Sequence, residues 1–224
     1  MRAHPQIAID GAAGTGKSTI GERLARRLGC PYVDTGAFYR TLTAVALDEG
    51  ITPEDAETLL SLAGRMAITI VPPTIADGRQ YTVLVDGVDY TQRLRTPSVE
   101  SAVSRVSRHT AVRTALIQRM RELASERGVV MVGRDIGTVV LPDADLKIFL
   151  MTALEERAKR RHGDLVAAYS EAAPSLEKVR EEIAQRDAID APNMQVAPEA
   201  VRIDNTTLEA DDVVARVLQI LAEL

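Results

Sequence analysis

Short apolar runs alternate with longer amphipathic segments along most of the chain. The apolar runs have the length and composition of buried strands and lie at residues 6–10, 31–33, 129–133, 145–150 and 201–204. The amphipathic segments have helical periodicity and lie at residues 18–28, 37–49, 97–107, 111–126, 175–190 and 209–224. Strands that alternate with helices are typical of α/β folds, in which helices connect parallel strands. We therefore expect an α/β fold with a parallel core sheet flanked by helices.

Capping residues predict where two further helices begin. Thr52 precedes a proline and two acidic residues, which is typical of an N-cap and a first helical turn, and this helix is expected to end near Gly64. Thr152 and Glu155 have the spacing of a capping box at the start of a very basic helix. A polar stretch around residues 162–174 is expected to separate this basic helix from the next one.

Residues 65–95 interrupt the alternation of strands and helices. Three strand-like runs follow one another at 67–71, 80–85 and 88–90, with the turn dipeptides Asp-Gly at 77–78 and 86–87. Consecutive strands joined by tight turns pair in antiparallel fashion. The pattern therefore predicts a small antiparallel β insert on the main fold.

Composition narrows the class of protein. The chain has 224 residues, 46% of them hydrophobic, which fits one domain with a substantial core. A net charge of -5 argues against a protein that coats nucleic acid. No apolar run approaches the ~18 residues that span a bilayer, and no signal-peptide pattern is present, so no membrane association is expected. A single cysteine and three scattered histidines predict neither a disulfide nor a metal site, so the reducing cytoplasm is the expected compartment.

A phosphate-binding loop follows the first predicted strand. It matches the pattern G-x-x-x-x-G-K-[ST] at Gly11, Ala12, Ala13, Gly14, Thr15, Gly16, Lys17 and Ser18. Such a loop points backbone N–H groups at phosphate oxygens, and the helix that follows adds partial positive charge. Lys17 is expected to reach the β- and γ-phosphates, and the Ser18 hydroxyl to bind Mg²⁺. The motif and its strand–helix context predict that the chain binds a nucleoside triphosphate.

A second polar segment follows the second predicted strand and runs from Asp34 to Arg40. It lies at the carboxyl edge of the sheet, where open α/β sheets bind ligands. Its hydroxyl, glycine and arginine could hold a second phosphorylated molecule. Asp, Thr and Gly are also common as a plain helix cap, so both interpretations stay open on these residues alone.

Four further motifs accompany the phosphate loop. They are Asp34-Thr35-Gly36-x-x-Tyr39-Arg40, Arg95-Thr96, Gly133-Arg134-Asp135-Ile136-Gly137-Thr138-Val139-Val140-x-Pro142-Asp143-Ala144 and Arg186-Asp187-x-x-Asp190. Taken together, these motifs resemble those of bacterial cytidylate kinases. They occur in the family's order over nearly the whole chain. The resemblance implies a P-loop nucleoside monophosphate kinase fold with a helical lid. It also implies transfer of a phosphoryl group from ATP to CMP or dCMP, with Mg²⁺ as cofactor.

The resemblance also implies roles for individual residues. ATP phosphates would be bound by residues 11–19, which add Thr19 to the loop. The acceptor nucleotide would be bound by Thr35, Arg40, Arg95, Ser104, Arg113, Arg134, Asp135, Arg186 and Asp190. Of these, the resemblance places Ser104, Arg113 and Asp135 at the cytosine edge. The groups implied to act in catalysis are Lys17, Arg134, Arg157 and Arg161.

The same resemblance divides the chain into three functional regions. The core would comprise residues 1–34, 127–152 and 193–224. The monophosphate-binding region with the β insert would be 35–126, and the lid 153–192. A single kinase domain that acts as a monomer is expected.

Two positions depart from the family pattern. Val132 stands where the family usually has an acid, and Asn193 where many members have an arginine. Any water that the acid holds toward Mg²⁺ would have to be held by Asp10 or Asp34 instead. Two alternatives to a CMP kinase remain: a kinase for UMP, AMP or a metabolite, and a nucleotide-dependent switch.

Overall fold

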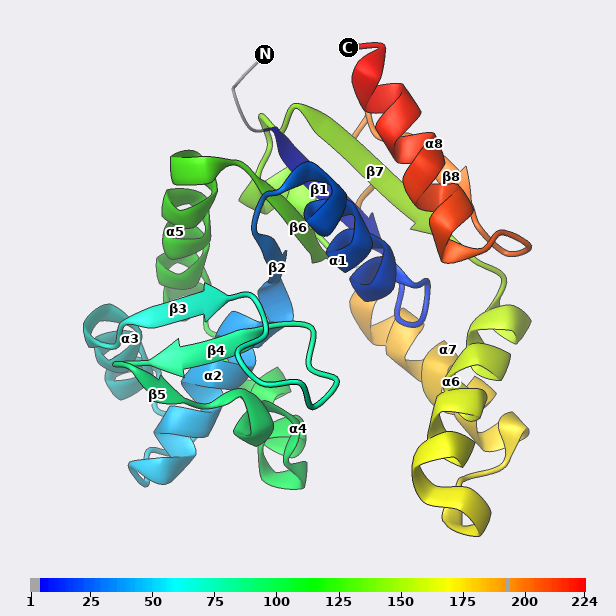
Figure 1. Ribbon diagram of the computed structural model, residues 1–224. Helices are drawn as coiled ribbons and strands as arrows, with labels where there is room; N and C mark the ends of the chain where they lie inside the picture. The colour runs from blue at the N-terminus through cyan, green and yellow to red at the C-terminus, as the bar shows by residue number, and fades with distance from the viewer. Residues whose placement is uncertain (1–4, 192–193) are drawn as a thin grey trace. The chain divides into compact units, whose positions relative to one another are not determined.

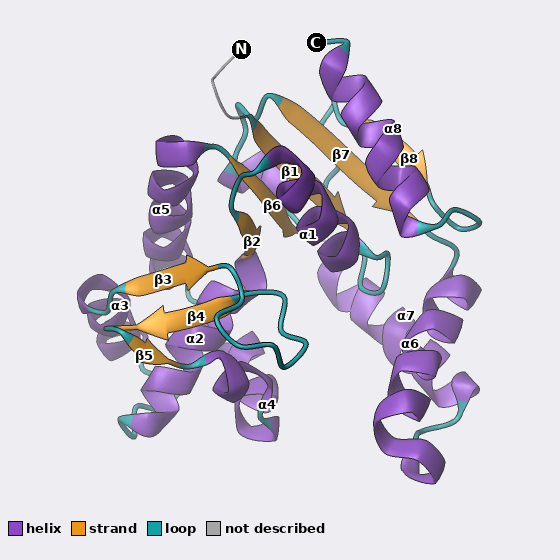
Figure 2. Cartoon of the chain, viewed as in Figure 1, coloured by secondary structure: helices purple, strands orange, loops and turns teal. Residues whose placement is uncertain are grey.

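The computed structural model describes residues 5–191 and 194–224 (Figure 1, Figure 2). It divides the chain into two compact units. The first comprises Met1–Gly29 and Val130–Leu224, and the second comprises Cys30–Val129. The assignment of core, monophosphate-binding and lid regions to particular functions stays a prediction.

A five-stranded parallel sheet has the order β2-β6-β1-β7-β8. Its strands are β1 (Gln6–Gly11), β2 (Tyr32–Asp34), β6 (Val129–Gly133), β7 (Leu146–Met151) and β8 (Val201–Asp204). Ile7 of β1 lies opposite Leu146 of β7, and Ile148 of β7 lies opposite Val201 of β8. Every residue of β1 is buried, as expected for a parallel strand that is covered on both faces. The predicted α/β fold with a parallel core sheet is confirmed.

The helices of the first unit form two groups. The first group is α1 (Lys17–Leu28) with α8 (Ala210–Ala222), and the second is α6 (Leu154–Tyr169) with α7 (Leu176–Asp190). Arg23 of α1 forms an ion pair with Asp211 of α8 at 3.1 Å. The helices of the second group lie side by side (Figure 1). They have a small core of their own, in which Ala158 packs with Val179 and Ile183.

The second unit combines helices with a small antiparallel sheet of order β3-β4-β5. Its elements are α2 (Thr35–Asp48), α3 (Ala56–Arg65), β3 (Ile68–Val71), β4 (Thr82–Val85), β5 (Val88–Asp89), the 3₁₀ turn η1 (Thr91–Arg95), α4 (Pro97–Val106) and α5 (Thr110–Arg127). Ile68 lies opposite Val85, and Leu84 opposite Asp89. The predicted antiparallel insert is confirmed. Ala37 of α2, Val83 of β4 and Leu94 of η1 form its buried cluster.

The predicted cap at Thr52 is wrong. Helix α3 begins at Ala56, and its N-cap is Asp55, whose carboxylate accepts from the backbone N–H of Thr58 at 3.0 Å. The Thr58 hydroxyl donates to the same carboxylate at 2.7 Å. Residues 52–55 form a turn instead, because the Asp55 N–H donates to the Thr52 carbonyl at 3.1 Å. The aspartate outcompetes the threonine because a carboxylate accepts both donors at once.

The predicted capping box at Thr152 is also wrong. Helix α6 has Ala153 as its N-cap without a side-chain cap, and the Thr152 hydroxyl donates to the side-chain oxygen of Asn205. The Ala153 N–H donates to the Thr206 hydroxyl at 3.0 Å. Contacts with the segment after β8 therefore replace the local cap. Helix α6 also continues to Tyr169, into the predicted polar stretch.

Membrane-spanning helices and clusters of metal-ligating side chains are both absent from the described part of the chain. None of the helices within residues 5–191 and 194–224 is long and apolar enough to cross a membrane. In the same part of the chain, no group of three or more histidine, cysteine, aspartate or glutamate side chains is arranged to hold a metal ion.

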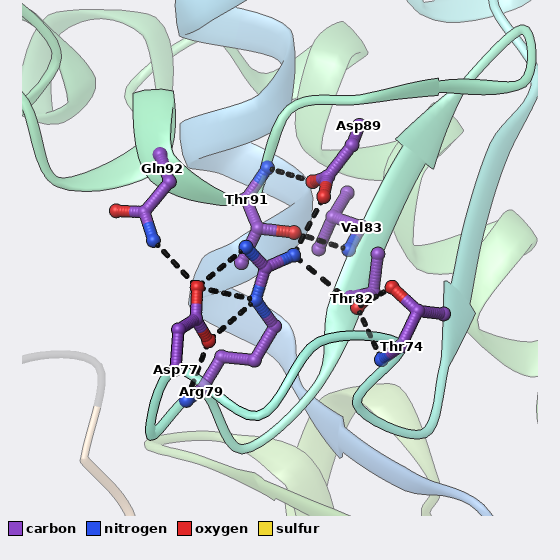
Figure 3. Close-up of polar contacts among 8 residues, drawn as sticks. All are labelled: Thr74, Asp77, Arg79, Thr82, Val83, Asp89, Thr91 and Gln92. Atoms are coloured by element: carbon purple, nitrogen blue, oxygen red, sulfur yellow. Dashed lines mark hydrogen bonds and ion pairs between the residues drawn. The ribbon is translucent and has the colours of Figure 1, made fainter.

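An arginine clasp holds the connection between β3 and β4 (Figure 3). The Arg79 guanidinium donates to both carboxylate oxygens of Asp77, and its Nη1 donates to Asp89 at 2.6 Å. Gln92 of η1 donates to Asp77 at 2.9 Å. The Arg79 side chain is only 7% exposed. The hydrogen bonds from Arg79 lower the pKa of Asp77, and those from Thr91 and Arg79 lower the pKa of Asp89.

Replacing the clasp arginine should change how stability depends on pH. A carboxylate whose native pKa lies below its unfolded value of ~3.9 stabilises the fold above that pH, and this stabilisation is lost as the pH falls. Arg79→Gln should therefore lower the melting temperature at pH 7. It should also make the melting temperatures at pH 7 and at about pH 3 differ by less than they do in the wild type. Arg108→Gln, at an exposed arginine with no side-chain partner among the described residues, is the control. An unchanged difference in Arg79→Gln would contradict the prediction.

Candidate functional site

The loop between β1 and α1 presents its carbonyl groups to side chains rather than to the space the loop encloses. The Ala12 carbonyl accepts from the Lys17 ammonium at 2.6 Å and from the Thr15 hydroxyl at 3.0 Å. The Ala13 carbonyl accepts from Arg157 at 3.0 Å, and the Thr15 carbonyl accepts from the Asn205 amide at 2.9 Å.

Peptide planarity turns these contacts into an orientation of the N–H groups. In a trans peptide the carbonyl of one residue and the N–H of the next point in opposite directions. Holding the carbonyls of Ala13 and Thr15 therefore directs the N–H groups of Gly14 and Gly16 to the opposite side. Inward N–H groups in consecutive turns form a nest that binds anions. The loop therefore has the backbone arrangement that its sequence motif predicts.

Asn205 supports this loop and carries no signal in the sequence motifs. It is 2% exposed and follows β8, so that it links the Thr15 carbonyl to the hydroxyl of Thr152. Arg160 of α6 donates to the carbonyls of Asn205 and Thr206 at 3.0 and 3.3 Å. The one indication in the sequence is its place directly after a strand, at the carboxyl edge of the sheet.

Asp10, the residue before the loop, connects it to the Gly-Arg-Asp-Ile-Gly segment. Its two carboxylate oxygens accept from the N–H groups of Ile136 and Gly137 at 2.7 and 2.8 Å. Asp10 is 5% exposed. The pKa of Asp10 is raised, mainly because the carboxylate is buried. The charge of Asp135 raises it further, and the two backbone N–H groups and the charge of Lys17 offset part of the rise. Asp10 therefore fixes the turn that carries Asp135.

The end of β6 and the end of α7 meet in an ion-pair cluster. Oδ2 of Asp190 lies 2.7 Å from Nη2 of Arg134 and 3.2 Å from Nε of Arg186. Asp190 is 7% exposed. The structure thus brings together three of the residues implied to bind the acceptor nucleotide. Val132, three residues before Asp135, is buried in β6.

The two implied catalytic arginines of α6 differ in their surroundings. Arg157 is buried and donates to the carbonyls of Ala13 and Thr152 and to both oxygens of Asp187. Arg161, one turn later, is exposed and makes no hydrogen bond or ion pair within the described part of the chain. The guanidinium of Arg157 is therefore held by the protein, whereas that of Arg161 faces solvent.

In the second unit, Asp34 organises the start of α2. Its Oδ1 accepts from the Gly36 N–H at 2.9 Å, and its Oδ2 accepts from Arg40 at 2.7 Å and from the Tyr81 hydroxyl at 3.4 Å. A Cβ on residue 36 would lie 2.7 Å from Nη1 of Arg40, so a larger residue there would displace the Arg40 guanidinium. Burial alone would lower the pKa of Arg40, but the interactions with Asp34 and Tyr81 together outweigh it, and the pKa is raised.

The other implied acceptor residues of this unit lie on η1, α4 and α5. Arg95 is exposed and lies 3.4 Å from Glu100, and Ser104 is half-buried. The Arg113 guanidinium lies over the Tyr39 ring, 5.7 Å from its centroid. Thr35, the first residue of α2, is buried.

Comparison with known proteins assigns the chain to a family. A family model described as cytidylate kinase matches residues 7–223. The cytidylate kinase of Chloroflexus aggregans is 48% identical over 219 residues, covering 97% of this chain and 94% of the relative. The cytidylate kinase of Geobacillus kaustophilus is 46% identical over 228 residues, covering 100% of this chain and 99% of the relative. The chain belongs to the cytidylate kinase family.

This membership confirms the family resemblance that the motifs indicate, and with it the enzyme class, a nucleoside monophosphate kinase. Among solved structures, an uncharacterized protein from Eubacterium ventriosum is 10% identical, with a TM-score of 0.52 over 99% of each chain. That likeness concerns the fold alone.

The site residues implied by the cytidylate kinase resemblance keep their roles as predictions. Asn193 lies outside the described residues, so its replacement of an arginine has no structural description. Asp10 and Asp34 are the two acids expected to hold Mg²⁺ waters in the absence of an acid at position 132. Both already bind protein groups: Asp10 accepts from two N–H groups, and Asp34 pairs with Arg40. The sequence motifs do not include Asn205 or Tyr81, and they assign no role to Asp187, because the contacts of these residues are tertiary.

Loss of the Asp10 carboxylate should destabilise the first unit. In Asp10→Asn the amide NH₂ would face a backbone N–H, leaving one buried donor unsatisfied. We expect the free energy of unfolding in urea to fall by about 1–3 kcal/mol. Asp143→Asn, at an exposed acid after the same turn, should change it by less than about 0.5 kcal/mol. Equal effects of the two variants would argue against the role of Asp10.

Proposed function

We propose that the protein transfers the γ-phosphoryl group of ATP to CMP or dCMP, giving ADP and CDP or dCDP. The observation that carries the proposal is the phosphate loop, whose carbonyls are held by Lys17, Arg157 and Asn205 in a chain of the cytidylate kinase family. The test is ADP release from ATP with CMP, dCMP, UMP, AMP or no acceptor. Turnover with UMP or AMP above that with CMP would contradict the proposal.

In this proposal residues 11–19 bind the phosphates of ATP. The Ser18 hydroxyl is the protein ligand for Mg²⁺, and it fits this role because it makes no hydrogen bond with other described residues. When bound, Mg²⁺ neutralises charge on the β- and γ-phosphates. Lys17 adds its charge beside them.

Each of the two units is proposed to contain residues that bind the acceptor nucleotide. In the second unit Arg40 binds the monophosphate with Thr35 and Arg95. Its Nε is buried without a hydrogen-bond partner among the described residues, which leaves a donor for a phosphate oxygen. In the first unit Arg134 neutralises phosphate charge, Arg186 contributes a lid contact to the acceptor, and Asp190 accepts from the hydroxyls of its sugar.

Cytosine recognition is proposed for Asp135, Arg113 and Ser104. Cytosine presents an amino donor beside ring N3 and O2 acceptors. A carboxylate accepts from the amino group, and an arginine donates to the acceptors. Uracil has a carbonyl and an N–H in the corresponding positions, so the same set of groups disfavours UMP.

No general base is required for this transfer. The second pKa of a phosphate monoester is ~6, so the attacking oxygen of CMP is largely deprotonated at pH 7. The difficulty is the approach of two anions, which cationic donors in fixed positions reduce. A lid formed by residues 153–192, with Arg157 and Arg161, would limit ATP hydrolysis by excluding water. The proposal also includes a monomeric enzyme in the cytoplasm.

Replacing the loop lysine should remove most of the activity without unfolding the protein. Lys17→Ala deletes the cation beside the reacting phosphates, and the expected loss in kcat at saturating ATP is about 100-fold or more. The melting temperature should stay close to that of the wild type, because Lys17 is not part of the buried core. A loss of less than about tenfold would contradict the assigned role.

Base discrimination should depend on Asp135. Asp135→Asn has the same shape but adds an NH₂ donor that tolerates the carbonyl of uracil. The ratio of kcat/KM for CMP to that for UMP should therefore fall by about tenfold or more. An unchanged ratio in an otherwise active variant would remove Asp135 from cytosine recognition.

A further inference from the structure

Three segments of the first unit meet at the guanidinium of Arg157. Its Nε donates to the Thr152 carbonyl before α6 at 3.1 Å, and its Nη1 donates to the Ala13 carbonyl in the phosphate loop at 3.0 Å. Nη1 and Nη2 donate to the two oxygens of Asp187 on α7 at 3.0 and 2.6 Å. The Arg157 side chain is 7% exposed, so its charge depends on Asp187 for compensation.

Gly14 allows this approach of α6 to the loop. Its φ of 78° is in the left-handed region, and a Cβ on it would lie 3.3 Å from the Cβ of Arg157. The first turn of α6 therefore packs directly on the backbone of the loop. A change in the position of Arg157 changes the hold on the Ala13 carbonyl, and with it the direction of the Gly14 N–H.

Helix α7 carries a second carboxylate one turn after Asp187. Asp190 lies three residues later, on the same face of the helix, and its Oδ2 contacts Arg134 and Arg186. The last turn of α7 is thus bound to the phosphate loop through Asp187 and to the end of β6 through Asp190. Helices α6 and α7 lie side by side (Figure 1) and share one small core.

From this arrangement we propose that Asp187 is a positioning residue that couples nucleotide binding at the phosphate loop to acceptor binding at Arg134, Arg186 and Asp190. The inference rests on the proposed function, which places ATP and CMP at these two groups. A ligand that orders the loop fixes Arg157, which fixes Asp187 and the last turn of α7. Coupling of this kind is reciprocal, so each ligand strengthens the binding of the other by the same factor.

The experiment measures CMP binding by titration calorimetry, with and without saturating magnesium and a non-hydrolysable ATP analogue. For the wild type, the analogue should lower the Kd of CMP by about fivefold or more, a typical allosteric factor. In Asp187→Asn this factor should fall to within about twofold of one, because the amide lacks the charge that holds Arg157. Asp187→Glu, which keeps the charge, should restore part of it.

Glu182→Gln is the matched control, because it removes one negative charge from an exposed position on the same helix. It should keep the wild-type factor. A factor near one in the wild type, or a wild-type factor in Asp187→Asn, would overturn the coupling. A lower melting temperature of Asp187→Asn with an unchanged factor would also overturn it, since the residue would then act on stability alone. Absence of CMP binding to the wild type in both conditions would instead refute the proposed function, and the coupling with it.

Discussion

The arrangement of the first unit depends on holding the carbonyl groups of a short loop away from the space that its N–H groups face. The carbonyls of such a loop have no partners in a helix or sheet. If no side chains bound them, they would compete with a bound anion for the donors around the loop. Lys17 takes the Ala12 carbonyl from within the loop, while Arg157 and Asn205 take the next ones from α6 and from the segment after β8. Elements far apart in the sequence are therefore needed to shape a five-residue loop.

The buried charged groups of this unit, like the loop carbonyls, are held by partners from other segments. Each of Asp10, Arg157 and Asp190 is less than 10% exposed, and each is matched by two or more partners of opposite charge or polarity. An unmatched charge at this depth would be strongly destabilising, so each group fixes its partners as much as they fix it. These contacts join the ends of β1 and β6, the loop and the last turn of α7. Arg134 and Arg186 are therefore part of the same network of contacts as the loop.

The second unit uses one carboxylate for a comparable purpose. Asp34 caps α2 and holds Arg40, which folds back over Gly36, where a side chain would collide with it. The Tyr81 hydroxyl reaches the same carboxylate, and burial raises the pKa of this tyrosine, so it stays protonated as a donor. Tyr81 comes two residues after Arg79, whose clasp fixes the preceding connection. The small sheet thus supports the residue proposed to bind the monophosphate.

The sequence by itself determined the fold class, the phosphate loop, the antiparallel insert and the family, because these depend on local patterns. Apolar periodicity identifies strands and helices one at a time, and the loop motif depends on residues that are adjacent in the chain. Only the tertiary structure decided where helix α6 begins, because contacts with Asn205 and Thr206 replace its local cap. The cap of α3 is local, and the structure showed which of two nearby candidates, Thr52 or Asp55, caps the helix. The tertiary structure alone also revealed the partners of Arg157, since Asp187 lies thirty residues away and Ala13 lies 144 residues away. Pairing of buried charges is a property of the packed chain, and no spacing in the sequence encodes it.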